Sequence, residues 1–145
     1  MTGPAATTLA AIEDLLASVC AAERTEDFIA GRGMASPSVR TPGGTRIEGL
    51  DQPAISSLEV RPWDGEAVGV VEVEIAPDAA PTWGEVRVRL GPFEELPRLH
   101  PGPAALAAEW WRPHLPVDAT LLVIDPGSPD VPLTHLNIRR GRSHP

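Results

Sequence analysis

Four histidines, one cysteine and several acidic residues are the side chains of this 145-residue chain that could do chemistry. The histidines are His100, His114, His135 and His144. None of their spacings places two metal ligands on one helix face or across a tight turn, so we predict no metal site and no cofactor. Residues at the ends of expected elements remain as candidate proton donors and acceptors, in falling order: His100, His135, Glu94 and Asp125.

Motifs for nucleophilic catalysis and phosphate binding are missing. The sequence contains no Gly-x-Ser-x-Gly, and Gly43-Gly44 lacks the preceding strand and following helix that a phosphate-binding loop requires. All 12 basic residues are arginine and tyrosine is absent, which excludes a Schiff-base lysine and a phenolic acid. A lysine-free composition is typical of a GC-rich, bacterial genome. Acyl-enzyme chemistry and nucleotide binding are therefore not expected.

The charge balance argues against two classes of partner. Twelve basic residues against 20 acidic ones give a net charge of −8, which repels both nucleic acid and anionic membranes. A single cysteine, Cys20, cannot form an internal disulfide and is expected as a small buried residue. The apolar stretch 9–22 is interrupted by Glu13 and Asp14, so neither a signal peptide nor a membrane span is predicted. We expect a cytoplasmic protein.

These residues must be positioned by one domain, 1–145, that begins with a helix. Its apolar residues recur at intervals of three and four: Leu9, Ile12, Leu16 and Val19. Thr7 or Thr8 is expected as the N-cap, and the helix continues or restarts at Thr25. Residues 31–53 are rich in Gly, Pro, Ser and Thr, and the turn 41–44 allows a small hairpin or a flexible loop; the loop is favoured because the flanks of the turn carry few apolar residues.

A three-stranded meander is the clearest expected element. Alternating apolar and charged residues predict strands at 58–61, 71–75 and 86–90, and Asp64-Gly65 predicts a two-residue hairpin turn between the first two. That turn sets Leu58 opposite Val71. In the second hairpin we expect Val73 to face Val88 inside, with two ion pairs outside, Glu74 with Arg87 and Glu72 with Arg89.

The second half of the chain predicts a helix at 104–112, a central strand at 121–124 and a last strand at 133–139, with Leu136 and Ile138 inward. The fold class is thus α+β, with a mainly antiparallel sheet of five to six strands and helices packed on one face. The expected order is helix, three-strand meander, helix, two strands. A basic segment at 139–145 is expected as a disordered tail, or as an arm that fastens to an acidic surface.

The tryptophans suggest where a partner could bind. In an alternating strand, Trp83 points to the same side as Arg87 and Arg89. This side is the outward face of the sheet, where Glu72 and Glu74 are also expected. These five residues form the predicted binding surface. The alternative for Trp83 is a ring that lies across the aliphatic stems of neighbouring arginines.

Two functions fit these features. The first is a non-catalytic cytosolic interaction module, inhibitor-, immunity- or chaperone-like, that binds a protein partner and forms a homodimer. The second is a small cofactor-free enzyme of isomerase or cyclase type, or a small-molecule-binding protein. Its apolar pocket would be lined by three tryptophans, namely Trp63, Trp110 and Trp111. A closed pocket that touches a candidate proton-transfer residue would favour the second function.

Overall fold

The computed structural model describes residues 4–30, 39–41, 44–48, 54–62, 69–90, 94–95, 105–110, 117–124 and 129–143. The helices in this part of the chain are α1 (Pro4–Ala21), α2 (Thr25–Ala30) and α3 (Trp83–Leu90), with a 3₁₀ turn η1 (Pro77–Ala79). Its strands are β1 (Val39–Thr41), β2 (Gly44–Glu48), β3 (Ile55–Arg61), β4 (Val70–Ile75), β5 (Glu94–Glu95), β6 (Ala105–Trp110), β7 (Val117–Ile124) and β8 (His135–Ser143).

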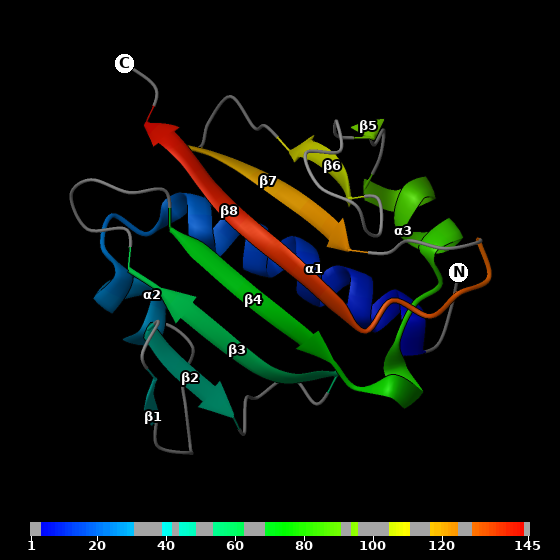
Figure 1. Cartoon of the computed structure of the whole chain (residues 1–145), viewed down its shortest axis with the longest axis horizontal. Helices are drawn as coiled ribbons and strands as arrows, with labels where there is room; N and C mark the ends of the chain where they lie inside the picture. Colours follow the sequence, from blue (N-terminus) through cyan, green and yellow to red (C-terminus); the bar gives the residue numbers. More distant parts are fainter. Residues whose placement is uncertain are drawn as a thin grey trace.

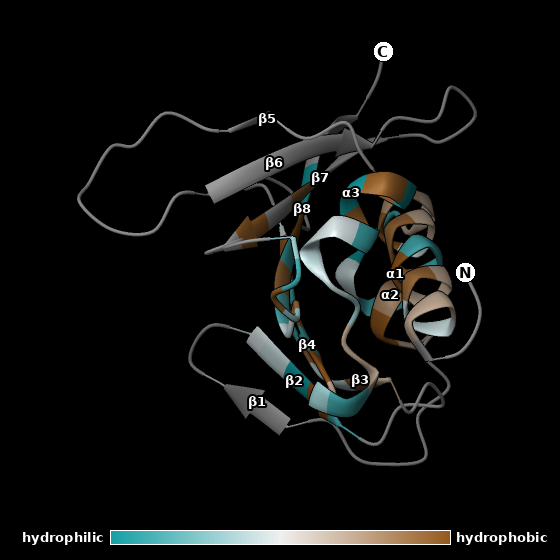
Figure 2. Cartoon of the chain, turned by 90° about the vertical axis from the view of Figure 1, so that its right-hand side faces the viewer, coloured by the Kyte–Doolittle hydropathy of each residue, from teal (hydrophilic) through white to brown (hydrophobic). Residues whose placement is uncertain are grey.

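The strands form one antiparallel sheet with the order β1-β2-β3-β4-β8-β7-β6-β5 (Figure 1). The last strand, β8, is inserted at the centre, between β4 and β7. Figure 2 shows α1, α2 and α3 on one side of the sheet. The α+β class and the antiparallel sheet are therefore confirmed, whereas the predicted five to six strands and the predicted element order are not.

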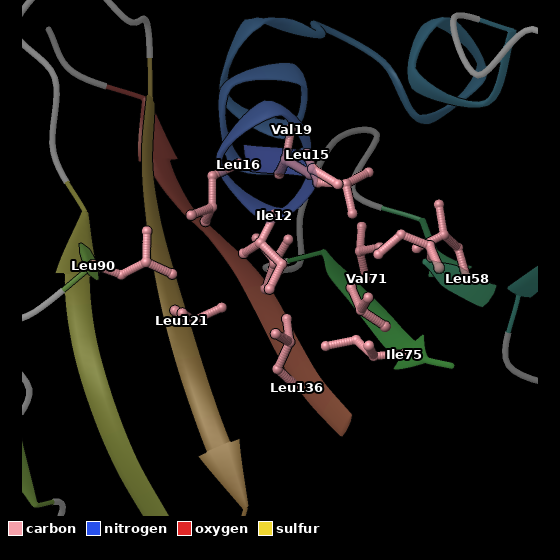
Figure 3. Close-up of a cluster of buried hydrophobic side chains, with 14 of the residues drawn as sticks. Ile12, Leu15, Leu16, Val19, Leu58, Val71, Ile75, Leu90, Leu121 and Leu136 are labelled. Atoms are coloured by element: carbon pink, nitrogen blue, oxygen red, sulfur yellow. The ribbon is translucent and has the colours of Figure 1, made fainter. Parts of the chain in front are cut away.

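Helix α1 covers the middle of the sheet with the apolar face that its spacing predicts. Leu9, Ile12, Leu16 and Val19 are all 0% exposed, and Cys20 is buried beside them. In Figure 3 the side chains of Ile12 and Leu16 lie close to those of Leu121 and Leu136. The predicted N-cap is wrong, because the helix already begins at Pro4. Thr8 lies inside it and donates a hydrogen bond of 2.7 Å to the carbonyl oxygen of Ala79 in η1.

The first hairpin has the predicted faces but a different register. Leu58 pairs with Val73 and Val60 with Val71, two residues away from the predicted pairing of Leu58 with Val71. A shift of two keeps every apolar residue on its original face, so the alternation alone does not distinguish the two registers. The predicted turn at Asp64-Gly65 lies outside the described residues.

The predicted third strand, 86–90, is wrong, because these residues belong to α3. Thr82 and Glu85 form a reciprocal capping box: the Thr82 amide donates to Glu85 Oε1 at 3.0 Å, and the Glu85 amide donates to Thr82 Oγ1 at 3.2 Å. Both interactions satisfy amides that the first turn of a helix leaves without partners. Val86 is then buried while Val88 is 86% exposed, so the predicted contact between Val73 and Val88 does not form.

Two further segments differ from the predictions. Residues 39–48 contain the hairpin β1–β2 instead of a continuous loop, because β2 is held against β3 and buries Ile47. Residues 105–110 form strand β6 instead of a helix, and pair with β7 through contacts such as Leu106 opposite Val123. Here the strand pairing overrides the helix preference of an alanine-rich segment.

The end of the chain is also more ordered than predicted. Strand β8 runs to Ser143, so residues 139–143 are part of the sheet and not a tail. Leu136 and Ile138 face the core, as predicted, and both are 0% exposed. Leu121 and Val123 of β7 are buried as well, which agrees with a strand inside the sheet. None of the helices in the described part of the chain combines the length and apolar character that crossing a membrane requires.

Candidate functional site

The sheet presents a polar face on the side opposite the helices. We call this the outer face and define it by the alternate residues of β2, β3, β4 and β8 that point away from the core. It consists of Arg46, Glu48, Ser57, Glu59, Arg61, Val70, Glu72, Glu74, His135, Asn137 and Arg139. Apart from Val70, the apolar residues of these strands point to the opposite, helix-covered side, as period-two alternation requires.

Strand register sorts the outer face into three rows that run across the strands. The cationic row is Arg61, Val70 and Arg139. The central row is Arg46, Glu59, Glu72 and Asn137, and the acidic row is Glu48, Ser57, Glu74 and His135. The charge therefore changes from positive to negative along the strand direction, within the length of four residues of β8.

Ion pairs connect these rows. Arg61 Nη2 of the cationic row lies 2.9 Å from Glu72 Oε1 in the central row. Arg46 lies between two acids of the acidic row, with its Nε 2.9 Å from Glu48 Oε1 and its Nη2 4.0 Å from Glu74 Oε2. These side chains are one third to two thirds exposed, so each pair contributes only about 0–1 kcal/mol to stability.

One pairing within the central row is electrostatically unfavourable. Glu59 and Glu72 are directly opposite one another across β3 and β4, where like charges destabilise a sheet. The diagonal contact of Arg61 with Glu72 offsets this repulsion. Beside them Ser57, which is 6% exposed, donates a hydrogen bond of 3.3 Å to Glu74 Oε2. The acidic side of the outer face is thus held in place by neighbours on β2 and β3.

Arg139 differs from the other two arginines of the outer face. It is exposed, it pairs in register with Val70, and its side chain forms no ion pair with any side chain in the described part of the chain. His135, four residues earlier on the same strand, is exposed as well, and its Nδ1 lies 3.4 Å from the hydroxyl of Thr134. β8 therefore contributes a guanidinium group to one end of the outer face and an imidazole group to the other.

The predicted binding surface is only partly assembled. Glu72 and Glu74 lie together on the outer face, but Trp83, Arg87 and Arg89 belong to α3 on the helix-covered side. Trp83 is 3% exposed, so its predicted place among outward residues is wrong. The Arg87 guanidinium carbon lies 5.8 Å from the centroid of its ring, which agrees with the alternative of a tryptophan covered by arginine.

The predicted ion pairs of Glu72 and Glu74 with α3 are wrong for the same reason. Arg89 instead pairs with Glu13 of α1, with Nε 2.6 Å from Oε1, and ties α3 to the first helix. The partners that Glu72 and Glu74 do have, Arg61 and Arg46, were missed by the sequence reasoning. Their signal was present: in 45–48 and 58–61 charged residues alternate with apolar ones, as they do in β4.

Of the four candidate proton-transfer residues, His135 is the one whose side chain belongs to the described part of the chain. His135 is on the outer face, away from the core, and Glu94 belongs to the short strand β5, where only the backbone is described. His100, Asp125, Trp63 and Trp111 lie outside the described residues, and Trp110 is in strand β6. The side chains between α1 and the sheet are aliphatic: Leu9, Ile12, Leu16, Val71, Leu121, Leu136 and Ile138.

Neither a metal site nor a known relative indicates a function. Within the described ranges, no three histidine, cysteine or acidic side chains are grouped so that they could hold a metal ion. No family model, curated protein or solved structure matches the chain.

Proposed function

We propose that this protein is a non-catalytic, cytoplasmic interaction module that binds a protein partner through the outer face. The observation that supports this proposal is the ordering of charge on that face, with a cationic row at one end of the strands and an acidic row at the other. A face that is positive at one end and negative at the other can bind a protein partner in one orientation only, since charge complementarity fixes orientation and excludes wrong partners.

The outer face also suits binding because its charges are preorganised. They stand on the central strands of a sheet whose other face is packed against the helices, so binding would not have to order a loop. Arginine supplies every cation of the face, and its planar guanidinium can bind a partner carboxylate through two parallel hydrogen bonds.

The test is a capture experiment with matched charge reversals. Immobilised protein is incubated with an extract of the source cell, and the captured proteins are compared for the wild type, Arg139→Glu and Arg24→Glu. Arg24 is an exposed arginine in the short connection between α1 and α2, and Figure 2 shows both helices on the side of the sheet opposite the outer face. The control therefore changes the net charge by the same amount at another surface. We expect Arg139→Glu to lose a protein that the wild type and Arg24→Glu both retain.

Two results would contradict the proposal. Capture of the same proteins by all three variants would show that the outer face is not the binding surface. Loss of the partner from Arg24→Glu alone would place the surface on the helix side. Circular dichroism of each variant confirms that the fold is retained before capture.

A further inference from the structure

We propose that the occupant of the outer face is a second copy of this chain, packed face to face about a two-fold axis that runs across the strands. This inference rests on the proposed function and names the partner for it. Its basis is that the outer face is complementary to itself: Arg61 and Arg139 define one end, and Glu48 and Glu74 the other.

The orientation follows from the order of the rows. Residues two apart on one strand are separated by roughly 7 Å, which is therefore the distance between neighbouring rows. A side chain of one copy can therefore contact only the row of the other copy that lies directly opposite it. An axis across the strands reverses the strand direction of the second copy and sets each cationic row against the acidic side of the other face. An axis along the strands would set like rows on like rows, which is repulsive. Charge thus selects one isologous arrangement.

The size of the sheet is compatible with a weak dimer. Eight strands at a separation of about 4.8 Å make a sheet roughly 34 Å wide, and a strand of six residues is roughly 20 Å long. Because β1 and β5 have only three and two residues, the area is smaller than this product and lies below the ~800 Å² per partner of a standard protein interface, as in weak complexes. The outer face as defined covers the part of this area on strands β2, β3, β4 and β8.

The net charge of −8 opposes association of two copies, and this opposition predicts an unusual salt dependence. The Debye length is about 30 Å at 0.01 M salt and about 8 Å at 0.15 M, so physiological salt screens the long-range repulsion but not ion pairs in contact. At 1 M salt the screening length falls to about 3 Å and weakens the contacts as well. We therefore expect dimerisation to be strongest at intermediate salt.

Charge exchange between the rows tests the arrangement in analytical ultracentrifugation. The variants are Glu74→Arg, Arg139→Glu, the double variant that carries both, and the helix-side control Arg24→Glu. Each single change should weaken the dimer by at least about tenfold, because it sets like charges against each other twice in the symmetric interface. The double variant should recover most of the affinity, and the control should behave as the wild type.

Glu74→Arg separates specific contacts from overall charge. This substitution lowers the net negative charge of the chain, so association governed by net charge alone would become stronger, whereas the proposed arrangement predicts that it becomes weaker. If circular dichroism shows that Glu74→Arg or Arg139→Glu does not fold, Glu74→Gln or Arg139→Gln replaces it. We expect each of these substitutions to cause a smaller loss of dimer affinity.

The outcomes distinguish this inference from the proposed function. A wild type that sediments as a monomer at every salt concentration and up to hundreds of micromolar protein would overturn the second-copy proposal. So would a double variant no better than the single ones. A monomer that nevertheless loses a captured protein in Arg139→Glu would overturn this inference alone, and leave a different protein as the occupant of the outer face.

Discussion

Arg140 connects the last strand to the end of the first helix, and its replacement should be among the most destabilising changes outside the aliphatic core. The residue is 9% exposed on the helix side of β8. Its Nη1 donates hydrogen bonds to the carbonyl oxygens of Val19, at 2.9 Å, and Ala22. Val19 lies in the last turn of α1, which finishes at Ala21 and has no basic residue in that turn, and Ala22 follows the helix directly.

The expected loss follows from the groups involved. A hydrogen bond with one charged partner contributes about 1.5–3 kcal/mol, and a cation at a partly buried helix C-terminus contributes up to about 2 kcal/mol. Burial of the guanidinium offsets part of this gain. For Arg140→Met, which keeps an unbranched apolar stem but no donor, we expect a loss of about 3 kcal/mol in the free energy of unfolding. Arg140→Lys keeps the charge without the planar fork and should lose about half as much.

Urea denaturation of four proteins measures this loss: the wild type, Arg140→Met, Arg140→Lys and the control Arg24→Met. Arg24 is close to the same helix end, but its side chain is 61% exposed and pairs with Glu26 at the surface. The control should change stability by less than about 1 kcal/mol. Equal losses for Arg140→Met and Arg24→Met would refute the reasoning, because they would show that the buried contacts to α1 contribute no more than a surface ion pair.

Three further predictions test the fold by substitution. Val73→Asp buries a carboxylate in the core and should cost several kcal/mol, whereas Val88→Asp, at a position 86% exposed, should cost less than about 0.5 kcal/mol in the same urea titration. Thr82→Ala should destabilise α3 by about 1 kcal/mol in thermal unfolding, and Glu85→Gln by less, since glutamine also completes a capping box. Gly44→Ala would place a methyl group against a β3 carbonyl oxygen, so hydrogen exchange should show faster opening of β1 and β2 while β4 stays protected.

The sequence predicts the faces of elements better than their pairing. Period-two alternation placed Val71, Val73, Leu136 and Ile138 in the core, and period 3.6 did the same for α1. The alternation predicts the register of strand pairing less well, because a shift by any even number of residues keeps each side chain on the same face. The hairpin of β3 and β4 was therefore predicted two residues from its actual pairing.

The segment 83–90 shows how two local signals can compete. Its last five residues alternate as a strand would, yet the preceding Thr-x-x-Glu at Thr82 and Glu85 is a helix start signal, and Trp83, Val86 and Leu90 form a buried helical stripe. If this segment were a strand, the side chains of Thr82 and Glu85 would have no helix to cap. The helix satisfies both of them, and also places Arg87 and Arg89 in its last turn, where cations are favourable.

The candidate site was less predictable than the fold, because its rows are made by strands that are distant in sequence. Glu72 and Glu74 were recognisable as outward residues from their own strand, but their neighbours come from β2, β3 and β8. Arg46 was in a segment predicted as a loop, and Arg139 was where the predicted last strand, 133–139, meets the predicted tail, 139–145. Only the insertion of β8 beside β4 brings Arg139 into the cationic row with Arg61.

The same insertion explains why neighbouring arginines of β8 have opposite roles. Successive residues of a strand point to opposite faces, so a central strand that carries Arg139 outward must carry Arg140 inward, toward the helices. There the end of α1 offers carbonyl groups that need a donor, across a separation of 121 residues. One arginine therefore fixes the first helix to the last strand, and the other remains on the outer face for the partner that we propose.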